Sequence, residues 1–269
     1  MSYSYLDELE KKSIYIIREA KALFKNPAIL WSGGKDSTTM LYLIRKTFGE
    51  IPFPVIHIDT GWKFEEIYEF RDRLVKEWNF ELIIARHPLA GKLRPNGNVT
   101  RFQCCHTLKT LALKQVIEKY NFDAIFVAIR RDEHGIRMKE RYFSPRDKEF
   151  RWRYTDQDVE LSGWGIFWSD FAEAHHVRIH PMLHWSEVDI WLYIKRENIP
   201  VVSLYFAKNG YRYRSIGCKI CTKPIKSNAK TIDEIIEEIK REKGTERVGR
   251  AQDKEDPYIM QRLRALGYM

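Results

Sequence analysis

The six residues from Ser32 to Ser37 (SGGKDS) have the composition of a loop that holds phosphate groups. They follow a short apolar run that predicts a buried strand, and they precede a segment that predicts a helix. Two glycines let the backbone approach an anion closely, and the free N–H groups at the start of a helix attract it. The two serines add hydroxyl donors, Lys35 adds a mobile cation, and Asp36 is a candidate to hold Mg²⁺ or to cap the helix. The loop is not of the Walker A type, because that pattern is absent.

Two further polar pairs, His57 with Asp59 and Arg130 with Arg131, lie where predicted strands end. Ligands of open α/β sheets bind at the carboxyl ends of strands, so we expect both pairs to face the same crevice as the loop. His57 and Asp59 would then border the adenine or ribose; a core histidine and a helix-capping aspartate are the alternative. The arginines suit sulfate or phosphate oxygens and a charged transition state, with a solvated charged face as the alternative.

Four cysteines form two tight groups, Cys104 with Cys105 and Cys218 with Cys221. In a reducing compartment, clustered cysteines more often bind metal than form disulfides. Four thiolates suit a [4Fe–4S] cluster or zinc. An adjacent pair is awkward for an ordinary zinc site, so we favour the iron–sulfur cluster and keep zinc and four unrelated buried thiols as alternatives.

The composition is that of a folded globular protein, with 269 residues, 44% hydrophobic and 31% charged. We find no apolar run near the roughly 18 residues that a membrane helix needs and no signal peptide, so we expect a cytoplasmic protein without a membrane partner. The net charge of +9 suits a nucleotide, sulfate, an acidic protein or nucleic acid, or reflects a chain that is simply basic.

Apolar runs and helical repeats alternate along the first 130 residues, which predicts an α/β fold with a doubly wound parallel sheet. We expect a long loop region with a short hairpin over 137–169, one more strand over 177–181, and helices that begin with the capping boxes at Ser186 and Thr231.

We place a nucleotide-binding domain at residues 1–185 and a smaller helical and loop segment, with the CxxC pair and a basic tail, at 186–269. The predicted helices are 5–24, 38–47, 65–78, 108–120 and 188–196, and the predicted strands are 27–31, 55–58, 81–85 and 124–129.

The loop resembles the PP-loop of the ATP pyrophosphatases, which cleave ATP between the α and β phosphates. Nearly the whole chain resembles the small, ATP-binding subunits of heterodimeric sulfate adenylyltransferases, within the wider PAPS reductase group. The likeness lies in LWSGGKDSTTMLYL, FPVIHIDTGWKFEEIYEFRDR, AIRRDEHGIRMKER, HPMLHWSEVDIWLYIKRENIPVVSLY, SNAKTIDEIIEE and the ending ERVGRAQDKE…LRALGYM. It implies an adenine nucleotide alpha hydrolase-like fold, in which these residues hold the ATP phosphates: Ser32, Gly33, Gly34, Lys35, Asp36 and Ser37.

The resemblance implies an adenylyltransferase that converts ATP and sulfate to adenylyl sulfate and pyrophosphate, with Mg²⁺. Lys35, Arg130 and Arg131 are the implied catalytic residues, while His57 and Asp59 border the nucleotide. Since the reaction is steeply uphill, the resemblance also implies a separate GTPase subunit, and we expect an oligomer.

The cysteines depart from that family, because the Cys-Cys pair and distant CxxC resemble the cluster ligands of iron–sulfur adenylyl-sulfate reductases. Those reductases use a later cysteine as nucleophile, and no cysteine follows Cys221 here. Besides a PAPS or adenylyl-sulfate reductase-like enzyme, an iron–sulfur PP-loop enzyme that adenylates nucleic acid remains an alternative, for DNA phosphorothioation or tRNA thiolation. The cysteines and the basic charge favour the latter.

Overall fold

A computed structural model describes residues 4–153, 173–241, 246–251 and 258–268. Within these residues a six-stranded sheet has the order β3-β2-β1-β4-β6-β5. The strands β1, β2, β3, β4 and β6 run parallel, and β5 is an antiparallel edge strand beside β6. Their bounds are β1 (Pro27–Leu30), β2 (Val55–Ile58), β3 (Leu82–Ala85), β4 (Ala124–Val127), β5 (Phe143–Arg146) and β6 (His176–Ile179).

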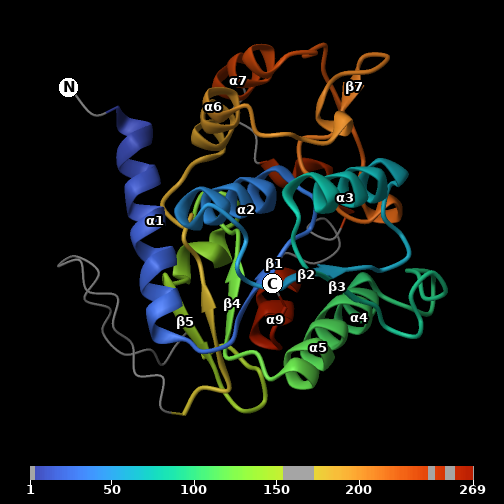
Figure 1. Ribbon diagram of the computed structural model, residues 1–269. Helices are drawn as coiled ribbons and strands as arrows, with labels where there is room; N and C mark the ends of the chain where they lie inside the picture. The colour runs from blue at the N-terminus through green and yellow to red at the C-terminus, as the bar shows by residue number, and fades with distance from the viewer. Residues whose placement is uncertain (1–3, 154–172, 242–245, 252–257, 269) are drawn as a thin grey trace.

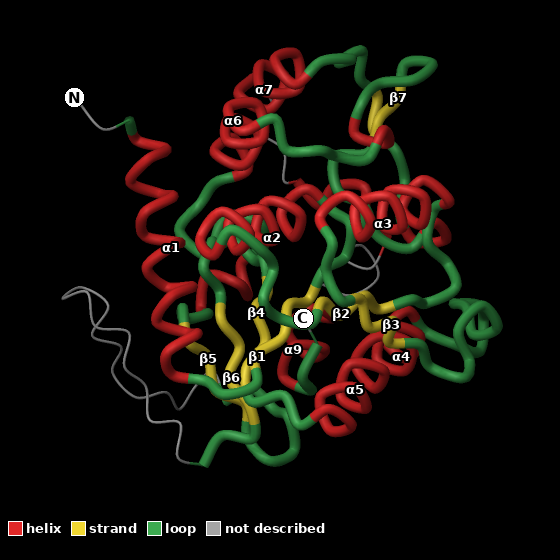
Figure 2. The backbone as a smooth tube through the Cα atoms, in the orientation of Figure 1, coloured by secondary structure: helices red, strands yellow, loops and turns green. Residues whose placement is uncertain are grey.

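Helices cover the sheet on both sides, with α2 and α3 drawn above β1–β3 and α5 below them (Figure 1). The predicted doubly wound α/β fold is therefore confirmed. The helices are α1 (Tyr5–Leu23), α2 (Lys35–Phe48), α3 (Glu65–Trp78), α4 (Arg101–Cys105), α5 (Ala112–Tyr120), α6 (Glu187–Glu197), α7 (Ile232–Arg241) and α9 (Ile259–Ala265). A small hairpin of β7 (Tyr211–Arg212) and β8 (Ile225–Lys226) lies apart from the main sheet (Figure 2).

The strand order explains where a ligand can bind. From β1 the chain proceeds to β2 and β3 on one side, and then returns to β4 and β6 on the other. Every residue of β1, β2, β4 and β6 is buried, as expected for parallel strands covered on both faces. The loop after β1 therefore lies at the switch point, where the helices on either side of it diverge and leave a crevice.

Both predicted capping boxes form. Ser186 Oγ accepts from the N–H of Asp189 at 3.2 Å, while the Asp189 carboxylate accepts from the N–H of Ser186 at 2.8 Å. Thr231 and Glu234 make the same reciprocal pair at the start of α7. These side chains satisfy N–H groups that the first turn of a helix leaves free, so the local sequence determines where α6 and α7 begin.

The structure differs from the predicted elements at two places. The helix expected over 108–120 begins earlier, because Thr100 and Gln103 form a further capping box and α4 continues through a π-helical segment (His106–Leu111) into α5. Cys104 and Cys105 consequently lie inside α4 instead of before a helix. The region 137–169, predicted as long loops with a short hairpin, contains β5, which pairs with β6 outside that region. Residues 154–169 of the region lie outside the described residues.

The C-terminal part is packed onto the α/β core. Helix α7 contacts α6, and α6 contacts α2. One hydrophobic cluster includes Ile29 of β1, Leu43 of α2 and Ile235 of α7, so it extends across the boundary that we predict at residue 185. None of the helices in the described part of the chain is long and apolar enough to cross a membrane.

Candidate functional site

The loop from Ser32 to Gly34 leads from β1 to the start of α2 at Lys35. Gly33 has a φ of +80°, which favours glycine, and Gly34 is the N-cap of α2. As a glycine, this N-cap has no side chain that could accept from the first turn. The N–H of Lys35 donates to the hydroxyl of Tyr205 at 2.8 Å, and Ser37 Oγ lies 3.0 Å from Ser32 Oγ. This end of α2, with its positive dipole, is suited to an anion.

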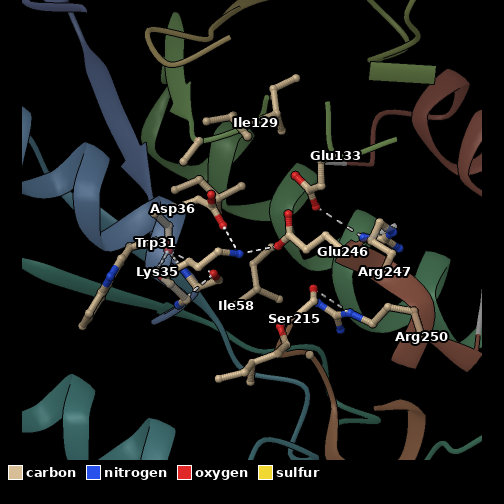
Figure 3. Close-up of a pocket in the computed structure, with 18 of the residues that line it drawn as sticks. Trp31, Lys35, Asp36, Ile58, Ile129, Glu133, Ser215, Glu246, Arg247 and Arg250 are labelled. Atoms are coloured by element: carbon tan, nitrogen blue, oxygen red, sulfur yellow. Dashed lines mark hydrogen bonds and ion pairs between the residues drawn. The ribbon is translucent and has the colours of Figure 1, made fainter. Parts of the chain in front are cut away.

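A pocket opens over this loop, between the carboxyl ends of β1 and β4 and two C-terminal segments (Figure 3). Ser32, Gly34, Lys35 and Ser37 line it from the loop side. The segment 215–217 and the turn Glu246–Gly249 line it from the C-terminal side. Residues from the first and the last parts of the chain therefore line the same pocket.

The two cations at the loop are already paired with carboxylates. Lys35 Nζ binds Glu246, lies 3.3 Å from Asp36 Oδ2 and lies 4.0 Å from Glu187 Oε1. Arg130 binds both Asp36 and Glu246, and its Nε lies 2.9 Å from Asp132 Oδ1. Burial alone would raise the pKa of the Glu246 carboxyl, but the charges of Lys35 and Arg130 hold that pKa below its ordinary value.

A second group of cations lines the pocket and its members act electrostatically on one another; we call this group the cationic end: Lys63, Lys109 and Arg250. In the described part of the chain, no ion pair joins any of them to a carboxylate. Arg250 donates to neutral oxygens, at 2.7 Å to the carbonyl of Ile216 and 3.1 Å to Ser215 Oγ, and Lys109 Nζ lies 3.3 Å from the Tyr268 hydroxyl. Burial lowers the pKa of Lys63 to about 8, a shift that Cys218 opposes and Lys109 reinforces. An anion bound here would compensate this charge.

The four cysteines lie next to the cationic end. All are free and buried, and Cys218 Sγ is 3.3 Å from Thr60 Oγ1. Burial, and then the neighbouring Cys105, Cys218 and Cys221 thiols, raise the pKa of Cys104 to about 12. The fold therefore brings the two cysteine groups together, although no group of three or more His, Cys, Asp or Glu among the described residues is arranged to hold a single metal ion.

Of the residues predicted for the nucleotide site, these are not among the residues that line the pocket: Gly33, His57, Asp59, Arg130 and Arg131. His57 is fully buried with its Nδ1 3.1 Å from the Trp31 carbonyl, and burial first, then Lys63, lower its pKa to about 3. Asp59 accepts from the Tyr68 hydroxyl at 2.7 Å and the Gly61 N–H at 2.8 Å. The reason is the alternation of a strand: Ile58 lines the pocket, so the side chains on either side of it point to the opposite face.

The two arginines follow β4 and lie in different surroundings. Arg130 is buried beside the loop, whereas Arg131 lies over the Tyr142 ring, 5.3 Å from its centroid. His57 fits the alternative of a core histidine, whereas Asp59 accepts from the turn at Gly61 and does not cap α3, whose N-cap is Phe64. Neither side chain lines the pocket, contrary to our expectation that both pairs face the crevice.

Several pocket residues are not singled out by any motif of the sequence, among them Lys63, Lys109, Tyr205, Glu246 and Arg250. The only signal for them is indirect, because Lys63 lies in the GWKFEE run and Glu246 and Arg250 lie in the ERVGR run of the family likeness. No local pattern distinguishes these charged residues from a solvated surface.

The fold and the pocket define an α/β nucleotide-binding protein with its phosphate loop at the switch point of the sheet. Residues 26–224 match the phosphoadenosine phosphosulfate reductase domain, and the chain belongs to that family. It is 40% identical to the sulfate adenylyltransferase subunit 2 of Photorhabdus laumondii and 41% identical to that of Zymomonas mobilis, with 98% of each chain covered in both comparisons. The resemblance to the small subunits of sulfate adenylyltransferases is thereby confirmed.

Solved structures support the same fold. Candida glabrata FMN adenylyltransferase in complex with FMN and the ATP analogue AMPCPP matches with a TM-score of 0.60 at 16% identity, covering 100% of this chain and 91% of that one. The phosphoadenylyl-sulfate reductase of Candida auris, in a phosphate complex, matches with a TM-score of 0.51 at 18% identity, covering 81% and 97%. At these identities the likeness concerns the fold alone.

Proposed function

We propose that this chain transfers the adenylyl group of ATP to sulfate, forming adenylyl sulfate and pyrophosphate. The observation that carries the proposal is one pocket that joins a phosphate loop to a second group of cations, which have no carboxylate partner among the described residues. The names of the curated relatives support the same reaction.

The loop end of the pocket suits the pyrophosphate part of ATP. The first-turn N–H groups of α2, the hydroxyls of Ser32 and Ser37 and the ammonium of Lys35 all lie at the lining. Arg130 is close enough to Lys35 to help neutralise the phosphate charge, since Lys35 and Arg130 both contact Asp36. We assign Asp36 to the Mg²⁺ that accompanies ATP. Catalysis there consists of positioning and neutralising the leaving group.

The cationic end suits sulfate. Lys63, Lys109 and Arg250 are three positive charges, and the described part of the pocket wall supplies no carboxylate to any of them, while sulfate is a divalent anion. A sulfate oxygen attacks the α-phosphorus from this end; the new O–P bond forms as the bond to the β-phosphate oxygen breaks, and pyrophosphate leaves toward Lys35. No proton needs to move in this step.

We propose a [4Fe–4S] cluster at Cys104, Cys105, Cys218 and Cys221. Four buried thiols that act electrostatically on one another support it, and the lack of a compact single-ion site among the described residues makes zinc the less favoured alternative. A cluster there would supply negative charge beside Lys109 and Lys63, whose charges lower the pKa of Cys218 against the effect of burial. Such a site fits a reducing cytoplasm.

We also propose that the chain acts with a second subunit. The relatives are named as a subunit 2, and forming adenylyl sulfate from ATP is uphill. A separate GTPase subunit, which the family resemblance implies, would supply the energy.

The experiment measures the reverse reaction, which is downhill and needs no GTP: adenylyl sulfate and pyrophosphate are supplied with Mg²⁺, and ATP is measured. ATP formation is the expected result. In parallel, ATP is supplied with sulfate, tRNA or DNA in the presence of pyrophosphatase. Phosphate release provoked by nucleic acid, with no ATP formed in the reverse assay, would replace this function by sulfur transfer to nucleic acid.

A further inference from the structure

Glu246 forms ion pairs with the two cations at the phosphate loop, Lys35 and Arg130. Its two carboxylate oxygens bind Lys35 Nζ and Arg130 Nη2, and Figure 3 shows the Glu246 side chain reaching across the pocket to Lys35. The side chains of all three residues are buried, with at most 5% of their surface exposed. Water therefore does little to weaken these contacts.

This carboxylate is in the way of a polyphosphate. Lys35 is the cation that a phosphate at the start of α2 would reach, and it already faces Glu246, Asp36 and Glu187. A pyrophosphate group that enters without displacing Glu246 brings its own negative charges against a buried carboxylate. Like charges in a desolvated site repel strongly, so the two anions exclude one another.

We propose that Glu246 is a built-in competitor for the pyrophosphate group: it holds Lys35 and Arg130 while the site is empty, yields them to the phosphates of ATP, and takes them back as pyrophosphate leaves. This rests on the proposed nucleotide site and adds a residue that sets both nucleotide affinity and product release. Glu246 touches the cations and not the reacting phosphorus, so it is a positioning residue.

The surrounding turn allows the exchange without rearranging the backbone. Gly249 accepts a hydrogen bond from the Lys223 N–H at 3.0 Å, and Arg250 is bound to Ser215 and the Ile216 carbonyl. A Cβ at Gly249 would lie 2.5 Å from the Lys223 carbonyl oxygen, so the two chain segments are in close contact there. With the turn held at these points, we expect the Glu246 side chain, and not the backbone after it, to move when phosphates enter.

The test is binding of inorganic pyrophosphate, AMPCPP and AMP to the wild type and to Glu246→Gln, by calorimetry with and without Mg²⁺. Glutamine keeps the size and removes the charge. Pyrophosphate and AMPCPP are expected to bind about tenfold tighter. AMP, which lacks the β and γ phosphates, is expected to bind unchanged. In turnover, KM for ATP and kcat should fall together, because pyrophosphate leaves more slowly.

Glu133→Gln is the matched control, since Glu133 also lines the pocket but pairs with Arg137 and Arg247. If both variants bind pyrophosphate equally more tightly than the wild type, the cause is the general charge of the pocket and the proposal is overturned. Weaker pyrophosphate binding by Glu246→Gln only with Mg²⁺ would make Glu246 a metal ligand and overturn it as well.

The experiment also distinguishes failure of the proposed nucleotide site from failure of the role of Glu246. If the wild type does not bind pyrophosphate and AMPCPP, both proposals are wrong. If the wild type binds them and Glu246→Gln binds them equally well, only the competitor role of Glu246 is wrong. Glu246→Asp serves as a second variant, because its shorter side chain keeps the charge but cannot span both cations. An intermediate tightening is expected for it.

Discussion

Lys35 is the residue on which the phosphate assignment depends. We expect Lys35→Met to reduce pyrophosphate-dependent ATP formation by about 10- to 150-fold, since one charge-assisted contact in a desolvated site contributes about 1.5–3 kcal/mol. Lys46→Met on the exposed part of the same helix, where Lys46 pairs with Glu10 and Glu197, is the control and should turn over normally. Circular dichroism checks folding. A folded Lys35→Met enzyme with the wild-type rate would rule out the loop as the pyrophosphate site.

Lys63 tests the opposite end of the pocket. Lys63→Met should raise KM for sulfate by about tenfold or more and leave ATP affinity unchanged, because its charge lies at the cationic end and not at the phosphate loop. Lys76→Met on the exposed face of α3 is the matched control. Sulfate saturation curves and direct nucleotide titrations separate the two effects. A loss of ATP affinity with sulfate KM unchanged would place sulfate elsewhere.

At the scale of elements, the cysteines link α4 to the segment that follows β7. We expect anaerobically purified protein to contain about four iron and four sulfide per chain with the visible absorption of a cluster. Cys221→Ser should lower the iron content and loosen the 218–221 segment, measured as faster hydrogen exchange, because a site assembled from two segments couples metal binding to folding. One zinc without sulfide, or four titratable thiols without metal, would refute the cluster.

Elements that repeat a clear pattern can be predicted, while the side-chain direction at a strand end cannot. The apolar runs and capping boxes locate β1, β2, α3 and α6 closely, since each depends on neighbours in sequence. Whether His57 or Ile58 faces the pocket depends on which side of β2 carries the crevice, and that is a property of the assembled sheet. The short hairpin expected within 137–169 could not be assigned to particular residues, because the sequence of β5, FSPR, contains a proline and only a short apolar part.

At the scale of the whole molecule, the pocket is completed by chain that folds back from far away. The loop after β1 is recognisable from six consecutive residues, but Glu246 reaches it only because the C-terminal part packs over the switch point of the sheet. No local pattern encodes such a contact. The phosphate loop could therefore be predicted from the sequence, whereas Glu246, which pairs with its cations, could not. The same packing places Tyr268 at the pocket beside Lys109.

The burial that builds this core also makes stability depend on pH. Burial is the largest cause that lowers the pKa of His57 and of His180 to about 3, so both stay neutral in the folded state. An unfolded chain binds protons at these histidines below an ordinary pKa of about 6.5. Because the unfolded state then holds more protons, stability falls as the pH drops from about 6.5 toward 3 and is insensitive to these groups above that range.

The groups that face His57 are the Trp31 carbonyl, Asp59, Lys63 and Arg71, and the two cations disfavour a further positive charge. On going from pH 7 to pH 5, we expect proton binding by each of these histidines in the unfolded state to lower the free energy of unfolding by about 2 kcal/mol. His57→Gln keeps a donor for the Trp31 carbonyl but cannot titrate, so it should be less stable at pH 7.5 and lose about 2 kcal/mol less than the wild type on going to pH 5. Urea unfolding of both proteins at pH 7.5, 6 and 5 measures the difference, and parallel losses in the two proteins would show that His57 already accepts a proton in the folded state.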